Sequence, residues 1–239
     1  MSTAEAERRA PIVGLWRSAL AAVLLVGAVV VGAPSTVLAE VSGATPGTPR
    51  GAAATITAGG SHMCALLDNG TVKCWGNGIA GRLGNNDDTN IGDGTGPSVA
   101  ASDPIDLGTG RTATAITAGD LHTCALLDNN TVKCWGFGSA GRLGTNATTN
   151  IGDGTGPSVA ASDPVDLGTG RTATAITAGG SHTCALLDNN TVKCWGNGSA
   201  GRLGTNATTN IGDGTGPSVA ASDPVDLGTG RTATAITAG

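Results

Sequence analysis

The sequence predicts an all-β repeat protein, and three observations support this. Residues 111–170 and 171–230 differ at only three positions, and a more diverged copy precedes them, which gives a period of 60 residues. A fixed period of this size is typical of a repeat architecture. Each repeat contains short apolar segments of strand length bounded by Gly, Asn or Asp, and none keeps a helical period over ten residues. In the second repeat the expected strands are Ala113–Thr117, Thr123–Leu127, Thr131–Trp135 and Pro164–Leu167.

Residues 1–39 are expected to form an export signal, the only helical segment of the chain. Three arginines precede an apolar run of fifteen residues at 19–33, and Val37-Leu38-Ala39 places small residues before a cleavage site at Glu40. The run is short for a membrane span, although an uncleaved N-terminal membrane anchor stays open as the alternative. Nothing after residue 40 is long or apolar enough to cross a bilayer, so no stable membrane insertion is expected after cleavage.

The rest of the chain divides into a linker and the repeats. Residues 40–52 are rich in Gly, Pro, Thr and Ala and are interpreted as a linker. The predicted repeats are 53–112, 113–172 and 173–232, and residues 233–239 are the first strand of a fourth. Sixteen acidic and ten basic residues follow residue 39, a balance that argues against nucleic acid as a partner. With one Phe and no Tyr the core is thin, so covalent cross-links would help to stabilise it.

Each repeat contains a predicted β-hairpin with one cysteine in each strand. Asp68-Asn69-Gly70 fits a three-residue loop with its last residue at positive φ, where the other repeats have Asn. This loop places Cys64 opposite Cys74 as a non-hydrogen-bonded pair, with Cα atoms about 4.5 Å apart, which suits a disulfide. An even cysteine count behind an export signal favours disulfides, with free thiols or, least, a zinc site as alternatives. The predicted pairs are Cys64–Cys74, Cys124–Cys134 and Cys184–Cys194.

The string AGxxHTCALLDNxTVKCWGxGxxGRLG, followed by Pro-Val/Ile-Asp-Leu, resembles the repeat of the regulator of chromosome condensation family. The resemblance implies that each repeat forms about one four-stranded antiparallel blade of a seven-bladed β-propeller. Three blades would form an open arc with two bare faces, because a propeller covers its blade faces only by closing radially. A fragment of a longer array is the favoured interpretation, and self-association through the open blade faces is the alternative.

The His, Trp and Arg that recur in each repeat are residue types found in functional sites, but here they are expected to have structural roles. By the resemblance, the repeated His should hydrogen-bond within its blade. The Trp, present once per repeat, is expected to pack in the core, and the Arg, which lies in a turn, to be exposed or paired with an acidic neighbour. The Gly runs lack the Lys and the helix of a phosphate-binding loop, and Asn85–Asp93 lacks the spacing of a calcium loop. No catalytic residue, cofactor site or metal site is therefore predicted. The recurring residues are His62, His122, His182, Trp75, Trp135, Trp195, Arg82, Arg142 and Arg202.

The long loops at 85–103, 145–163 and 205–223 are the predicted binding surface, each with an Asp expected to be exposed: Asp93, Asp153 and Asp213. Loops of this length without internal structure are usually functional or disordered, and disorder stays open as the alternative. The predicted function is that of a secreted, non-enzymatic binding module for a protein or surface ligand. Guanine-nucleotide exchange on a small GTPase, an activity found in the family, is one alternative, and an extracellular enzyme acting on polysaccharide is another.

Overall fold

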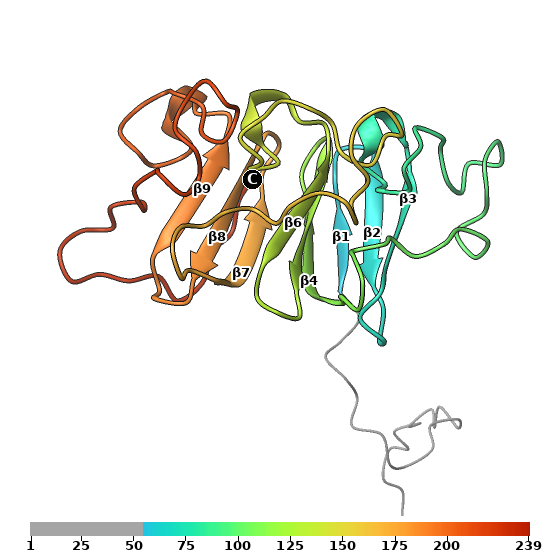
Figure 1. Ribbon diagram of the computed structural model, residues 1–239, viewed down its shortest axis with the longest axis horizontal. Helices are drawn as coiled ribbons and strands as arrows, with labels where there is room; N and C mark the ends of the chain where they lie inside the picture. The colour runs from blue at the N-terminus through green and yellow to red at the C-terminus, as the bar shows by residue number, and fades with distance from the viewer. Residues whose placement is uncertain (1–54) are drawn as a thin grey trace, which may run out of the picture. The chain divides into compact units, whose positions relative to one another are not determined.

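The computed structural model describes residues 55–239, which contain three antiparallel β-sheets of three strands each (Figure 1). The predicted signal at 1–39 and linker at 40–52 lie outside the described residues. Each sheet is followed by one 3-10 turn and a long loop. The elements are β1 Ile56–Ala58, β2 His62–Leu66, β3 Val72–Gly76, η1 Ile79–Gly81, β4 Ala113–Ala118, β5 His122–Leu127, β6 Val132–Gly136, η2 Ser139–Gly141, β7 Ala173–Ala178, β8 His182–Leu187, β9 Val192–Gly196 and η3 Ser199–Gly201.

The hairpin of each repeat has the predicted register and loop. Leu67 N donates to Thr71 O at 2.8 Å and Gly70 N to Leu67 O at 3.0 Å, so the loop-closing pair is hydrogen-bonded. Gly70 lies at φ +78° and Asn130, its counterpart in the second repeat, at φ +63°.

The cysteine pairs are disulfide-bonded inside these hairpins, which confirms the predicted pairing Cys64–Cys74, Cys124–Cys134 and Cys184–Cys194. Their Cα atoms are 4.0 Å apart, slightly closer than the expected separation of a non-hydrogen-bonded pair. Among residues 55–239 no cysteine is free.

The prediction of a fourth strand in each blade is wrong. In the second repeat the segment at Pro164–Leu167 lies along β6, but only Val165 N donates to the strand, at 2.8 Å to Val132 O. One hydrogen bond does not make a ladder, and Pro164, whose nitrogen faces away from β6, has no N–H for a further strand on the other side. Val165 and Leu167 are nevertheless buried, so the segment closes the edge of the sheet with side chains rather than with backbone hydrogen bonds.

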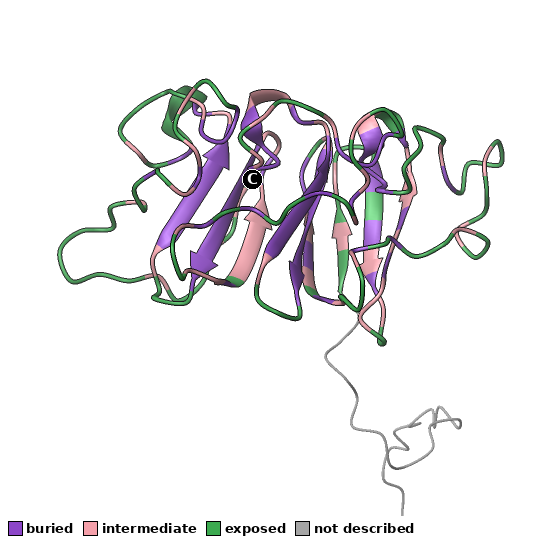
Figure 2. Ribbon diagram, in the orientation of Figure 1, coloured by how far each residue is buried: buried purple, intermediate pink, exposed green. Residues whose placement is uncertain are grey.

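The three sheets stand side by side in chain order, with β4 packed on β1 and β2 and with β7 packed on β4 and β5 (Figure 1). All six residues of β5 are buried, whereas Met63 in β2 is 37% exposed. Figure 2 shows β6, β8 and β9 as buried, whereas β7 is largely intermediate and the first sheet includes exposed residues. No helix among residues 55–239 has the length and hydropathy needed to cross a bilayer.

Candidate functional site

One backbone carbonyl joins each pair of adjacent repeats. Arg82 O, in the turn of the first repeat, accepts hydrogen bonds from Thr123 Oγ1 and from Trp135 Nε1 of the second, both at 3.1 Å. His62 Nε2 lies 2.8 Å from the same Thr123 hydroxyl. The next interface repeats this arrangement with His122, Arg142, Thr183 and Trp195.

These contacts assign structural roles to the histidine and tryptophan residues, as predicted, with one correction. His62 and His122 hydrogen-bond to the neighbouring repeat, not within their own, because their rings lie against the strand that carries Thr123 or Thr183. Burial, and next the charge of Arg82, lowers the pKa of His62 to about 4. Burial also lowers the pKa of His122 to about 3, so both rings are neutral at neutral pH.

The turn arginines were predicted to be exposed or paired with an acidic neighbour. Two of the three are buried, and Asp88 and Asp120 attract their charges. Arg82 and Arg142 are buried, while Arg202, which no following hairpin covers, is exposed. Arg82 Nε donates to Ile79 O at 2.9 Å, and the Arg142 guanidinium lies 5.1 Å from the centre of the Phe137 ring. Burial lowers the pKa of Arg82 and Arg142, which remain charged at neutral pH.

The acidic residues of the long loops organise those loops. Asp153 accepts hydrogen bonds from Thr155 N and Gly156 N at 2.9 Å and from Asn150 Nδ2 at 3.0 Å. Burial raises the pKa of Asp153, but these hydrogen bonds together outweigh it and hold the pKa at about 2. Asp213 has the same partners in its own repeat. Contrary to prediction, Asp153 and Asp213 are buried, because each loop lies against the preceding repeat, and only Asp93 is exposed.

A lysine that the sequence pattern did not single out supports each long loop; Lys133 and Lys193 are buried and Lys73 is half-buried. Lys133 Nζ donates to Val159 O at 2.8 Å and to Ala160 O at 2.9 Å. Lys73 and Lys193 make the equivalent contacts. The recurrence of Lys at the same strand position indicated a shared structural role. The carbonyl that it binds could not be predicted, because it lies 26 residues away and belongs to no sequence motif.

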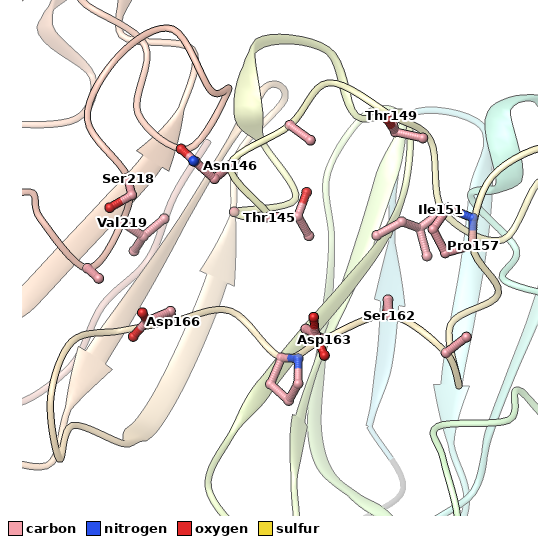
Figure 3. A pocket seen from close by; sticks show the side chains of 15 residues that line it. Thr145, Asn146, Thr149, Ile151, Pro157, Ser162, Asp163, Asp166, Ser218 and Val219 are labelled. Atoms are coloured by element: carbon pink, nitrogen blue, oxygen red, sulfur yellow. The ribbon is translucent and has the colours of Figure 1, made fainter.

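The long loops enclose a row of equivalent pockets, one per repeat. The pocket of the second repeat has a volume of about 510 Å3 and lies between its own loop and residues 218–220 of the next one (Figure 3). In Figure 3 Asp163 and Asp166 lie along one side of this pocket, and Asn146 and Ser218 lie together at another. The first and third repeats have pockets of about 430 and 540 Å3 at the same positions.

The chemistry of the pockets favours a ligand that carries positive charge or hydrogen-bond donors. Each is lined by two aspartates and by no Lys, Arg or His, and an apolar wall backs it. In the second repeat that wall includes Ile151, Pro157 and Pro164. Volumes of this size suit small ligands or single side chains of a polymer. Residues 55–239 contain no group of three or more His, Cys, Asp or Glu side chains that could hold a metal ion.

Comparison with known proteins identifies the repeat. The family model described as "Regulator of chromosome condensation (RCC1) repeat" matches residues 54–82, 113–142 and 173–202. These segments hold the three strands and the 3-10 turn of each repeat, and they leave out the long loops.

Among curated proteins, the chain is 31% identical over 154 residues to the ultraviolet-B receptor UVR8 of Arabidopsis thaliana, covering 64% of this chain and 31% of the receptor. It is 30% identical over 150 residues to the E3 ubiquitin-protein ligase HERC2 of Mus musculus, covering 62% of this chain and 3% of the ligase. The chain thus spans less than a third of the length of either relative.

Among solved structures, the yeast RCC1 protein Prp20, bound to Kap60, matches with a TM-score of 0.49 and 19% identity. That match covers 72% of this chain and 36% of Prp20. Human WBSCR16 matches with the same TM-score and 17% identity, covering 65% of this chain and 37% of the other.

Proposed function

We propose that the chain, three segments of which match the regulator of chromosome condensation repeat, is an exported, non-enzymatic interaction module whose loop pockets bind a partner. The observation that carries the proposal is the row of three equivalent pockets, each with two aspartates and no basic side chain. A partner with basic groups at regular spacing would place one in each pocket. The partner class is therefore an extended, positively charged segment of a protein or a surface polymer.

Export is supported by the covalent chemistry of the chain. Disulfides form and persist in oxidising compartments, and each of the three hairpins carries one. The same observation weighs against exchange on a cytoplasmic GTPase. N-terminal sequencing of protein from the culture medium should begin at Glu40. Recovery of intact Met1 in the membrane fraction would instead favour the uncleaved anchor.

The binding proposal is tested by removing one exposed carboxylate from each pocket. Asp103, Asp163 and Asp223 line the three pockets, and none is a hydrogen-bond acceptor that organises its loop. Asp163 and Asp223 attract the charges of Lys133 and Lys193, but these lysines keep their hydrogen bonds to the loop carbonyls when Asp becomes Asn, so the triple change should leave the fold intact. The matched control changes Asp68, Asp128 and Asp188 to Asn. These aspartates lie at the hairpin loops, outside the pockets, and their replacement alters the net charge equally.

The probe is a Lys-Ser repeat peptide, with a Glu-Ser repeat peptide as its charge-reversed counterpart. We expect the Lys-Ser peptide to bind the parent chain and the control with similar affinity, and binding to weaken as salt rises. The pocket variant should bind at least about tenfold more weakly, the loss expected for roughly 1.4 kcal/mol of binding free energy. Equal losses in the pocket variant and the control would show only nonspecific attraction and would overturn the proposed site.

A further inference from the structure

The second repeat departs from the third at only three positions, and at all three the first repeat agrees with the third. The differing pairs are Asp120/Gly180, Leu121/Ser181 and Phe137/Asn197. The first repeat, which has diverged elsewhere, carries Gly60, Ser61 and Asn77 there. The second repeat is therefore the exception, with two apolar side chains and a carboxylate where the other repeats are small or polar.

These three positions, which are distant in the sequence, lie together at one end of the second sheet. β5 begins at His122 and β6 ends at Gly136, and these two residues are paired. Leu121 and Phe137 therefore lie at the same end of the sheet, where Phe137 N donates to Leu121 O at 2.9 Å. Asp120 directly precedes Leu121. All the differences between the two repeats are thus concentrated in one place.

The fold does not require the three side chains of the second repeat. The third repeat makes the same backbone hydrogen bond, from Asn197 N to Ser181 O at 3.0 Å, without them. Asp120 is exposed, and Leu121 and Phe137 are half-buried, so none of the three belongs to the core. Apolar residues that face solvent and leave the backbone unchanged are typical of a recognition surface.

A third apolar side chain, from the first repeat, lies beside this cluster. Ile79 is 58% exposed and lies in η1, which packs against β6. The chain after η1 also lies against the residue before Phe137, because a Cβ on Gly136 would lie 3.3 Å from Arg82 Cα. We call Ile79, Leu121 and Phe137 the junction patch. The equivalent residues at the next junction are all polar: Ser139, Ser181 and Asn197.

The charge that a partner meets at the junction patch is negative. The Arg142 guanidinium lies 5.1 Å from the centre of the Phe137 ring, but Arg142 is buried, so a partner does not reach it. Asp120 attracts that guanidinium and is itself exposed. A carboxylate has several acceptor positions, so Asp120 can accept hydrogen bonds from a second cationic group in solution.

We propose that the junction patch binds a protein segment that presents a large apolar side chain next to a Lys or Arg. The apolar side chain covers Leu121 and Phe137 beside Ile79, and the basic group pairs with Asp120. Charge complementarity and the aliphatic side chains beside the ring favour such a segment over a polysaccharide, whose hydroxyls Leu and Ile cannot hydrogen-bond. The junction patch shares no residue with the three loop pockets, so the proposal does not rest on them.

The test is selection of a displayed random peptide library on the disulfide-intact chain, with counter-selection on a patch variant. The patch variant carries Asp120→Gly, Leu121→Ser and Phe137→Asn, which are the residues of the third repeat. It should keep the fold, because the third repeat has these residues on the same backbone. The control is the loop-pocket variant described above, which loses three carboxylates while the patch variant loses one.

We expect the enriched peptides to carry a large apolar residue close to a Lys or Arg, and to bind the parent chain and the loop-pocket variant with similar affinity. Their affinity for the patch variant should be at least about tenfold lower, as is usual when central apolar contacts of an interface are removed. Ile79→Ser, which copies Ser139, should weaken binding by a smaller factor.

Three results would overturn the proposal. The first is a selection in which no peptide distinguishes the parent chain from the patch variant. The second is enrichment of peptides that lack a basic residue, because the occupant would then not pair with Asp120. The third is an equal loss of binding in the loop-pocket variant, which would show general attraction to a negatively charged chain. The loop-pocket proposal is tested separately by the Lys-Ser peptide, whose binding the patch variant should leave unchanged.

Discussion

Replacing Thr123 with Val tests whether the histidine–threonine–carbonyl contact holds adjacent repeats together. Val keeps the shape of the side chain, which is fully buried, and removes only the hydroxyl. The change eliminates the 2.8 Å contact with His62 Nε2 and the 3.1 Å bond to Arg82 O. Arg82 O keeps its bond from Trp135 Nε1, whereas His62 Nε2 is left buried without a partner.

The expected loss in the free energy of unfolding is about 1–5 kcal/mol. Each lost hydrogen bond accounts for about 0.5–1.5 kcal/mol, and the unpartnered ring nitrogen adds about 1–3 kcal/mol. The extra buried methyl offsets about 0.8 kcal/mol of this cost. Thr114→Val is the control, because that hydroxyl donates to Leu126 O at 3.2 Å on an exposed residue and its removal should cost under about 0.5 kcal/mol.

The assay is equilibrium urea unfolding with intact disulfides, followed by tryptophan fluorescence and by circular dichroism. Trp135 and Trp195 are fully buried at the two junctions, so fluorescence reports the separation of repeats directly. A loss for Thr123→Val no greater than that for Thr114→Val would refute the reasoning. The junction would then depend on apolar packing, and the hydroxyl would be incidental.

Three further changes have defined outcomes. Removing one cross-link by changing Cys124 and Cys134 to Ala should cost about 3 kcal/mol, from the entropy of a loop of about eleven residues, measured by the urea midpoint. Asn130→Gly should be neutral or mildly stabilising, because Gly has no Cβ at φ +63°, and a clear loss would contradict the assigned turn. Burial lowers the pKa of His62 to about 4 and of His122 to about 3, so the unfolded chain binds more protons below about pH 6.5. The contribution of the two neutral histidines to the free energy of unfolding should therefore be fully present above that pH and decrease as the pH falls toward 4. A free energy of unfolding that stays constant over this range in urea titrations would contradict the burial of these rings.

The hairpins were predictable from sequence because every determinant is local. The loop Asp68-Asn69-Gly70 fixes the register, and the register alone brings Cys64 opposite Cys74. The strand bounds followed from the apolar pattern within one or two residues. The repeat unit itself was predictable because its copies are nearly identical.

The remaining features depend on the neighbouring repeat and have no local signal. Asp153 was expected to be exposed because its loop is polar, but the turn at Gly81 lies against that loop and buries it. The burial of Arg82 was not predicted either, because the second repeat packs against the turn that carries it. The fourth strand was predicted because its apolar alternation suits a strand, but the sequence did not reveal that only Val165 N bonds to β6.

The confinement of each disulfide to one hairpin affects how such a chain can change in length over evolutionary time. The bonded cysteines are separated by ten positions, far less than the 60-residue period. Unequal recombination between near-identical copies therefore adds or deletes a unit together with both of its cysteines. The noncovalent junctions between units are also preserved when units are added or deleted, because each uses the same donors and the same backbone acceptor. A lengthened or shortened gene therefore still encodes a chain whose neighbouring units pack together.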